Sequence, residues 1–466
     1  MLPADWIQVA GPLGAMIGLA VGGALMVIVG VSYGFLARTF PVAGGTFAYT
    51  LAGFGRNHAF ISAWFMVLGY VSIVALNASA LALLGRRLLP SVVERGYLYT
   101  IAGWDVYIGE VVIASAALVI FAVLNLWGAG NSARIQFYMA LVMLGAVAIL
   151  AFGMAIFSHN ALGNLRPAFA AEGSPIPGIL MVVGIAPWAF IGFDSIPQTA
   201  EEFDFPAKKA TGLIVWSLVA ATVLYVLMIF ATAAGAPWQE STATGSVWVV
   251  ADVISAVLGV VGLALLSVAA LMGIATGLNG FYMASSRALL AMGRANMIPR
   301  GFSLVNGRSG APSTAIWFVC LVGLPAPWFG RVALSWIVDM ASIGFTFALA
   351  YTSLTAYRVF SWTGQPARVP GSASTAKKLS SALGAVIAAV FTVLLLAPGS
   401  PAQLTPPSLI ALAFWALMGA AFFFSRRKRL ALTSDEDLYQ HVMGTSRPPW
   451  VLRETKNAPR PPANDE

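Results

Sequence analysis

Apolar runs of about 20 residues recur along the whole chain, and they restrict its fold more than any other feature. A helix of that length crosses roughly 30 Å of hydrocarbon, where every backbone N–H and C=O group must be paired inside the protein. Only 9% of the 466 residues are charged, whereas about 25% are charged in a typical soluble domain. The length of the runs therefore predicts an all-α membrane protein.

These runs predict one membrane domain, residues 1–425, followed by a tail, residues 426–466. The tail is charged and contains prolines but few apolar residues, which is typical of a disordered segment. The first apolar run is too long for a signal peptide, and no basic segment precedes it, so we expect it to be retained. Eleven spans are predicted, at residues 13–37, 59–84, 109–128, 136–157, 176–198, 211–234, 254–288, 313–329, 333–357, 380–397 and 407–425.

The basic residues are distributed unequally between the two sets of connecting loops. Of the 26 Lys and Arg residues, 21 belong to one set of loops or to the tail, and five belong to the other set. The five are Arg86, Arg87, Arg95, Arg166 and Arg331. The positive-inside rule then places the C-terminus in the cytoplasm. The net charge of +8 is explained by membrane topology, and no nucleic-acid partner is predicted.

Two further expectations concern the membrane and its lipids. The low lysine content with high alanine and glycine is typical of a GC-rich bacterium, which favours the bacterial inner membrane as the location, with a eukaryotic plasma membrane as the alternative. The basic cluster at residues 426–429, RRKR, follows the last span directly, where such a cluster fixes topology or contacts anionic lipid.

An odd number of spans with a cytoplasmic C-terminus puts Met1 on the outer side. Transporters more usually have an even number of spans with both ends inside. We interpret the difference as one helix missing from the front, either because the start is misassigned or because the chain is truncated.

A row of small residues lies on the first predicted span. Gly14, Gly18 and Gly22 recur at four-residue spacing, which allows two helix backbones to approach closely. Packing inside the bundle is one explanation of this row, and a homodimer formed through it is the other.

The segment FIGFDSIPQTAEE, residues 190–202, interrupts an otherwise apolar span. Gly192 relaxes the backbone, and Pro197 removes a hydrogen-bond donor and clashes one turn earlier. A helix broken in mid-membrane exposes N–H groups that suit a carboxylate and C=O groups that suit an ammonium, so it fits a zwitterion. The alternative is a proline-kinked helix with a capped aspartate, Asp194, and no ligand.

Three other residues of this region have two interpretations each. Trp188 is either a gate above a cavity or an aromatic residue of the membrane interface. Glu201 and Glu202 either form surface ion pairs with Lys208 and Lys209 or help to close an inner gate.

Enzymatic chemistry has little support in the sequence. The single cysteine, Cys320, and three scattered histidines form no metal-binding pattern, and no catalytic or phosphate-binding motif is present. Ionisable residues inside the spans are few, Asp194 and Asp339 being the clearest, and such residues are functional candidates by default. We predict that the protein is not an enzyme and holds no metal or cofactor.

Four segments carry a resemblance to a known family. AFIGFDSIPQTAEEFDFPAKK resembles the sixth-helix signature of the amino acid–polyamine–organocation permeases. SYGFLARTFPVAGGTFAY, residues 32–49, is similar to the second-helix signature of that family and to the loop after it. Residues 40–55, which overlap the end of this segment, predict a short interfacial helix. NLWGAGNSARIQ and SSRALLAMGRANMIPRGFSLVNGRSGAP resemble later segments of the same family, in the same order. The resemblance extends from the start of the chain to about Ser425.

The resemblance implies a LeuT-type bundle, in which two five-helix repeats of opposite orientation surround a site at the membrane midplane. The eleven spans would then be helices two to twelve of a twelve-helix permease, with helix one absent and Met1–Gln8 the segment that remains after it. Helix one normally supplies half of the substrate site in this family.

The resemblance also implies roles for individual residues. Trp188 matches an aromatic residue that covers bound substrate, and Ile191 and Gly192 match unwound backbone that meets the substrate's amino group. Phe190 and Phe193 flank that backbone and are included among the predicted substrate-binding residues. Asp194 matches an acidic position linked to the inner gate.

Helix three and helix eight supply further candidates. Tyr70, Ser72 and Asn77 lie at a suitable depth to face substrate, although each also has a structural explanation. Ser285 and Ser286 match hydroxyls of an ion site. Met143 stands where some proton-coupled members have a lysine, so a lysine mechanism is excluded, and the coupling ion, proton or sodium, stays open.

The function predicted from these features is secondary active transport of amino acids or related amines by alternating access. The alternative is a non-transporting, truncated relative with a regulatory role, and a membrane enzyme is the weakest alternative. The sequence does not identify the amino acid, although the absence of a midplane arginine favours a neutral or cationic substrate over an acidic one.

Overall fold

The computed structural model describes residues 3–42, 44–170, 173–198, 209–243, 246, 248–361, 375–400, 402–432 and 435–443. In this part of the chain the helices are α1 (Pro3–Thr39), α2 (Thr46–Phe54), α3 (Arg56–Leu88), α4 (Pro90–Val93), α5 (Ile108–Leu126), α6 (Ala129–Phe157), α7 (Ile176–Gly184), α8 (Ala186–Ala189), α9 (Ser195–Gln198), α10 (Ala210–Ala234), α11 (Trp238–Ala243), α12 (Val249–Arg294), α13 (Ser313–Gly323), α14 (Val332–Ser361), α15 (Thr375–Leu396), α16 (Pro406–Leu432) and α17 (Asp435–Met443). Two 3-10 helices, η3 (Arg300–Ser303) and η4 (Ala326–Phe329), and two antiparallel strands, β1 (Tyr97–Ile101) and β2 (Trp104–Tyr107), complete the described elements.

Nine of the described helices are long and apolar enough to cross a membrane, and each of them lies on one predicted span. The predicted span 313–329 is formed by the shorter α13 together with η4. The predicted span 176–198 is divided into α7, α8 and α9, as its glycine and prolines indicate. The all-α membrane fold is therefore confirmed.

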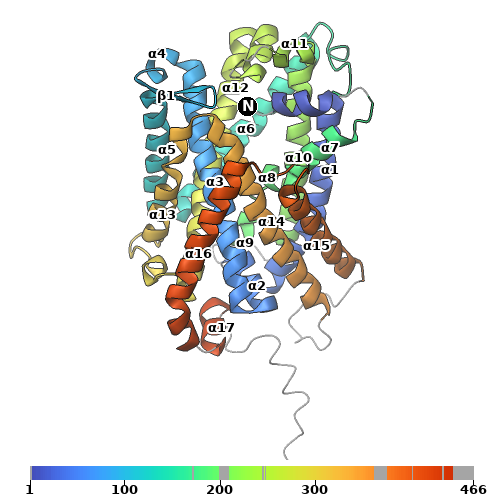
Figure 1. The fold of residues 1–466 in the computed structure, drawn as a ribbon. Coiled ribbons are helices and arrows are strands. Elements are labelled where there is room, and N and C mark those ends of the chain that lie inside the picture. Colours follow the sequence, from blue (N-terminus) through green and yellow to red (C-terminus); the bar gives the residue numbers. More distant parts are fainter. Residues whose placement is uncertain are drawn as a thin grey trace, which may run out of the picture.

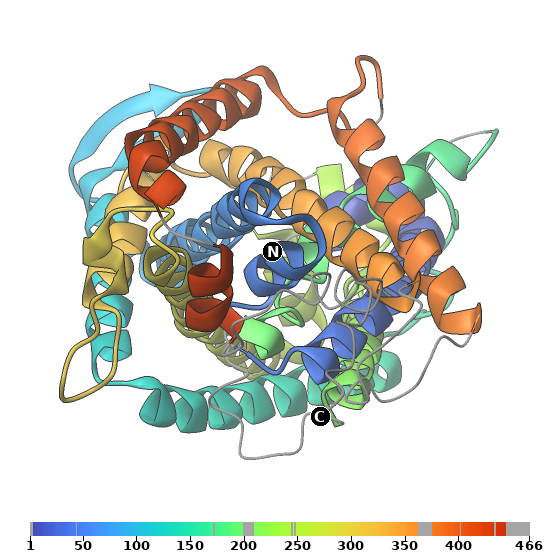
Figure 2. The same ribbon diagram turned by 90° about the horizontal axis from the view of Figure 1, so that it is seen from below.

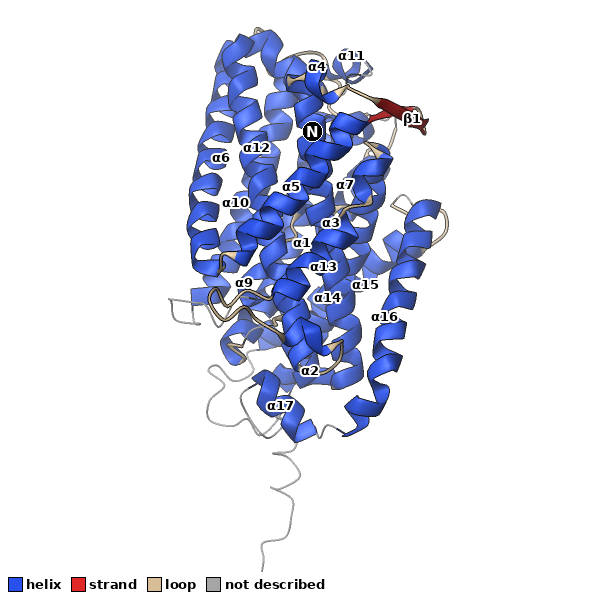
Figure 3. Ribbon diagram, turned by 90° about the vertical axis from the view of Figure 1, so that its left-hand side faces the viewer, coloured by secondary structure: helices blue, strands red, loops and turns tan. Residues whose placement is uncertain are grey.

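The helices form a bundle whose two ends carry different elements (Figures 1 and 3). The end with β1, β2, α4 and α11 is called the hairpin end, and the opposite end, with α2 and α17, is called the α2 end. Seen from the α2 end, α3 lies in the interior and α6, α15 and α16 lie at the rim (Figure 2). Burial agrees with this arrangement, since 83% of the most apolar window of α3 is buried but only 17% of that of α16.

A kink divides α1 close to the start of the predicted first span. Gly11 has a φ of 76°, and Pro12 follows it. A Cβ atom at Gly11 would lie 2.5 Å from the Cα atom of Phe169, so both the backbone conformation and the close approach of a neighbouring loop require glycine. The Leu13 N–H donates to the Ala168 carbonyl at 3.0 Å, which fixes that loop against the kink.

The β-hairpin is fastened to the end of α3 by Arg86. Its guanidinium lies 4.3 Å from the ring centroid of Trp104 and 4.9 Å from that of Tyr107. The same side chain forms ion pairs with Glu94 at 2.9 Å and with Glu110 at 3.5 Å. Because Arg86 and Glu110 are both largely buried, these contacts hold the hairpin over the end of the bundle.

The small residues of α1 pack inside the chain. A Cβ atom at Gly18 would lie 2.7 Å from Val182 of α7, and one at Gly22 would lie 2.8 Å from Ala186 of α8. Their row therefore brings α1 against the broken helix, which is the first of the two explanations considered for it. A homodimer stays a prediction and would need another surface.

We expect Gly18→Leu to destabilise the protein strongly. The added side chain meets Val182 and the backbone of Ile179, and overpacking of this kind costs about 1–3 kcal/mol. A fluorescence-based thermal unfolding assay in detergent measures the loss. Gly145→Leu is the matched control, because a Cβ atom at Gly145 meets nothing within 4 Å. Equal unfolding temperatures for the two variants would contradict close packing of α1 on α7.

Helix α2 is a buried element and not an interfacial one. Residues Thr46 to Ala52 are all buried, and the Thr46 hydroxyl donates to the Tyr33 hydroxyl at 3.2 Å and accepts from Thr352 at 3.2 Å. The expectation of an interfacial position is therefore wrong. The weak amphipathicity of this segment does not reveal that α1 and α14 supply hydrogen-bond partners for its polar residues.

Part of the tail that was expected to be disordered is helical. Helix α16 continues past residue 425 to Leu432, and α17 covers Asp435–Met443. Leu438 and Tyr439 of α17 are buried, and the Tyr439 hydroxyl donates to the Leu51 carbonyl of α2. Residues 444–466 lie outside the described part of the chain.

Candidate functional site

The broken helix is interrupted between α8 and α9, in the middle of the bundle. Residues 190–194 form turns, and Gly192 has a φ of 123°, which is a conformation that side-chain-bearing residues rarely adopt. Pro187 lies within α8 and Pro197 lies within α9, so prolines stand on both sides of the break.

Asp194 closes this turn. Its Oδ1 atom accepts the Gly192 N–H at 3.0 Å, while the Gly192 carbonyl accepts the Ser195 N–H at 3.0 Å and the Ser195 hydroxyl at 2.5 Å. The polar backbone groups of Gly192 are therefore paired within the turn, as a capped aspartate predicts. What a simple kink does not explain is the cavity beside the turn.

Tyr70 of α3 is the second partner of Asp194. Its hydroxyl donates to the Asp194 Oδ2 atom, and both side chains are fully buried. The Tyr70 ring also packs on Phe281 of α12, with ring centroids 5.7 Å apart. For Tyr70 a substrate-facing and a structural role were both considered, and the structure places its hydroxyl on the carboxylate that closes the turn, 124 residues away in sequence.

Removing the Tyr70 hydroxyl is expected to lower stability. Tyr70→Phe leaves Oδ2 of Asp194 without this hydrogen bond, and a bond to a charged group contributes about 1.5–3 kcal/mol. The unfolding temperature in detergent should fall by several degrees. The control is Tyr138→Phe on α6, because Tyr138 is 61% exposed and its variant should unfold like the parent chain. A Tyr70→Phe variant as stable as this control would show that the hydrogen bond contributes little.

A cavity of about 440 Å³, called the central cavity, borders the turn. Gly192, Ile191 and Trp188 form the wall that the broken helix contributes, and Asn77 of α3 and Met143 of α6 lie across from it. None of the described residues that line this cavity carries a charge. The others are Ile73, Leu76, Gln136, Ala189, Ser195, Tyr225, Gly273, Thr276, Gly277, Gly280 and Phe281.

Glycines on one face of α12 leave room for the central cavity and its polar groups. A Cβ atom at Gly277 would lie 2.5 Å from the amide nitrogen of Asn77, and one at Gly280 would lie 3.2 Å from that of Gln136. At Gly273 it would lie 3.3 Å from the sulfur of Met143. Any larger residue at these positions would press on the side chains that line the cavity.

Three amide side chains at this wall were not identified from the sequence. Gln136 donates to the Thr276 carbonyl at 3.1 Å and accepts from Asn279 at 3.1 Å, and Asn279 accepts from Asn125 at 3.2 Å. The chain of bonds joins α5, α6 and α12 at the edge of the cavity. The available signal was the presence of amides inside apolar spans, where polar groups are costly unless they are paired.

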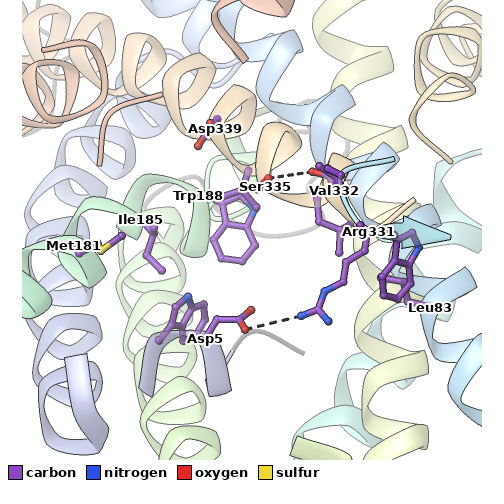
Figure 4. A pocket seen from close by; sticks show the side chains of 15 residues that line it. Asp5, Leu83, Met181, Ile185, Trp188, Arg331, Val332, Ser335 and Asp339 are labelled. Atoms are coloured by element: carbon purple, nitrogen blue, oxygen red, sulfur yellow. Dashed lines mark hydrogen bonds and ion pairs between the residues drawn. The ribbon is translucent and has the colours of Figure 1, made fainter. Parts of the chain in front are cut away.

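A second cavity, of about 590 Å³, opens at the hairpin end and is called the hairpin-end cavity (Figure 4). Trp188 lines both cavities, and its indole meets that of Trp6 edge to face, with centroids 6.3 Å apart. This position between two cavities favours the gate interpretation of Trp188 over the interfacial one.

The hairpin-end cavity is lined by charged residues, unlike the central one. Asp5 and Arg331 face each other across 4.0 Å. Asp339 also lines this cavity, and its Oδ2 atom accepts bonds from the Thr405 N–H at 3.1 Å and the Ser408 hydroxyl at 2.7 Å. These two bonds tie α14 to the start of α16.

Phe190 and Phe193 support the turn and do not line the central cavity. Phe190 packs on Tyr225, with ring centroids 5.6 Å apart. Phe193 packs on Tyr33 at 5.2 Å and on Phe345 at 5.9 Å. Both rings are buried, so they anchor the two sides of the break to α10, α1 and α14.

The remaining predicted site residues lie elsewhere. Ser72 is buried and does not line either cavity. The Ser285 hydroxyl donates to the Phe281 carbonyl at 2.6 Å and the Ser286 hydroxyl to the Met283 carbonyl at 3.0 Å, so both bond within α12. Glu201 and Glu202 lie outside the described residues.

Comparisons with known proteins agree in pointing to one family. A family described as "Amino acid permease" matches residues 2–422. The branched-chain amino acid permease BcaP of Lactococcus lactis subsp. cremoris is 26% identical over 366 residues, which cover 75% of this chain and 75% of that protein. The "Cationic amino acid transporter 8, vacuolar" of Arabidopsis thaliana is 25% identical over 359 residues, covering 75% of this chain and 58% of that protein. The aspartate-proton symporter of Bacillus subtilis is 24% identical over 367 residues, covering 75% and 67%.

Proposed function

The chain belongs to the amino acid permease family, and on that premise we propose that its substrate binds in the central cavity, against the turn at residues 190–194. As a member it is a multi-pass membrane protein and a secondary amino acid transporter, and it is not an enzyme. The observation that supports the proposed site is the position of the break. Gly192 and Ile191 line a cavity large enough for an amino acid, in a span that is otherwise apolar.

We propose that Trp188 separates the substrate from the hairpin end and that α2 and α9 close the α2 end. A Cβ atom at Gly45, just before α2, would lie 2.5 Å from Gln198 of α9, so these elements are packed tightly. Alternating access then requires Trp188 to move in one half of the transport cycle and α2 to separate from α9 in the other half.

The orientation is proposed from charge. Arg38, Arg56 and Arg358 at the α2 end belong to the set of loops that, together with the tail, holds 21 of the 26 Lys and Arg residues, whereas the other set holds five, including Arg86 and Arg87 at the hairpin end. We therefore propose that the α2 end and the C-terminus face the cytoplasm. A bacterial inner membrane remains the proposed location. Contact of residues 426–429 with anionic lipid and a homodimer are further proposals that rest on the sequence alone.

The substrate class follows from the lining of the central cavity. A substrate with an acidic or a basic side chain would need an opposite charge in a site removed from water. None of the described residues that line the central cavity supplies such a charge. Ile73, Leu76 and Met143 instead offer apolar contact. We therefore propose a neutral amino acid with an aliphatic side chain, a choice that the similarity to a branched-chain amino acid permease supports.

Proteoliposomes test this proposal. Purified full-length chain should take up radiolabelled L-leucine, and tenfold excess unlabelled L-isoleucine should compete, whereas L-lysine and L-aspartate should compete weakly. Empty liposomes are the control. Uptake of L-aspartate or L-lysine in place of L-leucine would overturn the substrate class. Failure to take up any of the four would remove support for the central cavity as the site.

A further inference from the structure

We propose that a groove between α3 and α16 binds one acyl chain of an anionic phospholipid, and that Arg426 holds the phosphate of this lipid at the α2 end. The groove, called the α3–α16 groove, has a volume of about 290 Å³. Of the ten described residues that line it, Asn57 is polar and the others are apolar or aromatic. None of them lines the central cavity, so the site is separate from the one proposed for amino acids.

Small residues on α16 create the groove. Ala416, Gly419 and Ala420 lie three and four residues apart, so they share one face of the helix. A Cβ atom at Gly419 would lie 2.3 Å from Nε1 of Trp64, so the indole of α3 rests directly on the backbone of α16. The Trp64 indole donates to the Trp415 carbonyl at 3.0 Å, and the Trp415 indole donates to the Trp64 carbonyl at 3.1 Å. These two bonds hold the helices together at the end of the groove that is remote from the α2 end.

The contacts between α3 and α16 also show how the two helices align along the groove. Trp64 lies against Gly419, and one turn away Phe60 packs on Phe423, with ring centroids 5.1 Å apart. The helices are therefore antiparallel, and each step of about one turn moves four residues along both of them. The next turn reaches the start of α3 and the end of the membrane span of α16, at the α2 end.

The polar end of the groove suits a phosphate. In this alignment Asn57 lies level with Arg426, and neither side chain forms a hydrogen bond or ion pair with a described residue. An arginine side chain holds a phosphate by two parallel charge-assisted hydrogen bonds, and an asparagine amide donates to an ester oxygen. Residues 427–429, RKR, follow directly in the sequence. Such a basic cluster at the cytoplasmic end of a span attracts anionic lipid.

The length of the groove matches an acyl chain. Its wall on α3 runs from Asn57 to Phe65, which corresponds to about 12 Å along the helix axis. One leaflet of a bilayer supplies about 15 Å of hydrocarbon. Ile61 and Phe424 on the walls are 38% and 63% exposed, so the groove opens onto the surrounding lipid. A single chain therefore fits along the groove with its headgroup at the α2 end.

A second copy of the chain suits this groove less well than a lipid does. Two copies related by a two-fold axis along the membrane normal would bring their basic clusters, residues 426–429, to the same membrane level. Like charges brought together across an interface cost free energy. A lipid phosphate neutralises the cluster instead, so charge favours the lipid as the occupant.

Native mass spectrometry of the full chain, released from detergent, tests the site with two lipids that carry the same acyl chains. The probes are 1-palmitoyl-2-oleoyl-phosphatidylglycerol, which is anionic, and the corresponding phosphatidylcholine, which has no net charge. We expect one tightly bound phosphatidylglycerol per chain, with an affinity at least about tenfold above that for phosphatidylcholine. Ala420→Phe should abolish this binding, because the added ring fills the groove. Ala421→Phe is the matched control, since Ala421 is exposed at the same depth and does not line the groove.

A second variant tests the headgroup contact. Arg426→Gln should lower the preference for phosphatidylglycerol over phosphatidylcholine about fivefold, because one basic group near the phosphate is lost. Binding of phosphatidylcholine should change little. Arg38→Gln is the control, since Arg38 also lies at the α2 end, in the last turn of α1, and it should leave the preference unchanged.

Three results would overturn the proposal. The first is equal retention of phosphatidylglycerol by Ala420→Phe and Ala421→Phe. The second is an equal affinity of the parent chain for the two lipids, because the basic residues would then play no part. The third is a dimer of the parent chain that Ala420→Phe dissociates, which would assign the groove to a second copy. Arg426→Gln decides the headgroup contact even if Ala420→Phe is less stable, because Arg426 has no bond with a described residue to lose.

Discussion

Replacing Gly192 by leucine is expected to abolish uptake of L-leucine in proteoliposomes, with initial rates at the level of empty liposomes. The φ of 123° at Gly192 is strained for any residue with a side chain. A Cβ atom there would lie 3.4 Å from the Phe281 ring, and the rest of the leucine side chain would extend into the central cavity. Both the turn and the space for substrate are lost at once.

A matched variant distinguishes this effect from general damage. Gly212→Leu also adds an isobutyl group to a glycine of the membrane domain, but a Cβ atom there meets nothing within 4 Å. It should be purified in similar yield and should keep most of the uptake. If Gly192→Leu is folded and transports as well as Gly212→Leu, the substrate does not depend on this turn.

Replacing Asp194 by asparagine is expected to reduce uptake by about one to two powers of ten. Asparagine retains the size of the side chain and an oxygen that accepts the Gly192 N–H. It loses the negative charge that accepts from Tyr70, and a hydrogen bond to a charged group contributes about 1.5–3 kcal/mol. The turn should then populate other conformations, so the maximal rate should fall more than the apparent affinity for leucine changes.

The coupling between Asp194 and Tyr70 makes this prediction specific. In a double-mutant cycle the losses from Asp194→Asn and Tyr70→Phe should not add, because each removes the same hydrogen bond. Asp252→Asn is the control substitution, since Asp252 pairs with Arg87 at 2.8 Å where both side chains are partly exposed. Uptake should be nearly unchanged in that variant. If the losses of uptake from Asp194→Asn and Tyr70→Phe add fully, the hydrogen bond between these two residues does not contribute to transport.

The sequence predicted the break correctly as a local feature but not the residue that stabilises it. Gly192 and Pro197 are neighbours in the chain, and their conformational limits do not depend on distant partners. Tyr70 was identified by its depth alone, with a substrate-facing and a structural role both considered, and no pattern within α3 shows that its hydroxyl faces Asp194.

A local sequence pattern cannot show which distant residues meet in the fold. Contacts of this kind were not predicted, or the residues were predicted at another position. Gln136 and Asn279 are 143 positions apart and meet at the wall of the central cavity. The segment that forms α2 was expected at the interface, yet Thr46 is bonded to residues of α1 and α14 in the interior.

By itself, the sequence determined the all-helical membrane fold, the positions of its spans and the break at Gly192, because hydrophobic length and backbone restriction act within a few turns of one helix. Only the tertiary structure decided which side chains face a cavity. It set Trp188 between two cavities and placed Asp5 beside Arg331, because helix packing selects which faces meet and residues far apart in the chain become neighbours only when whole helices are in position.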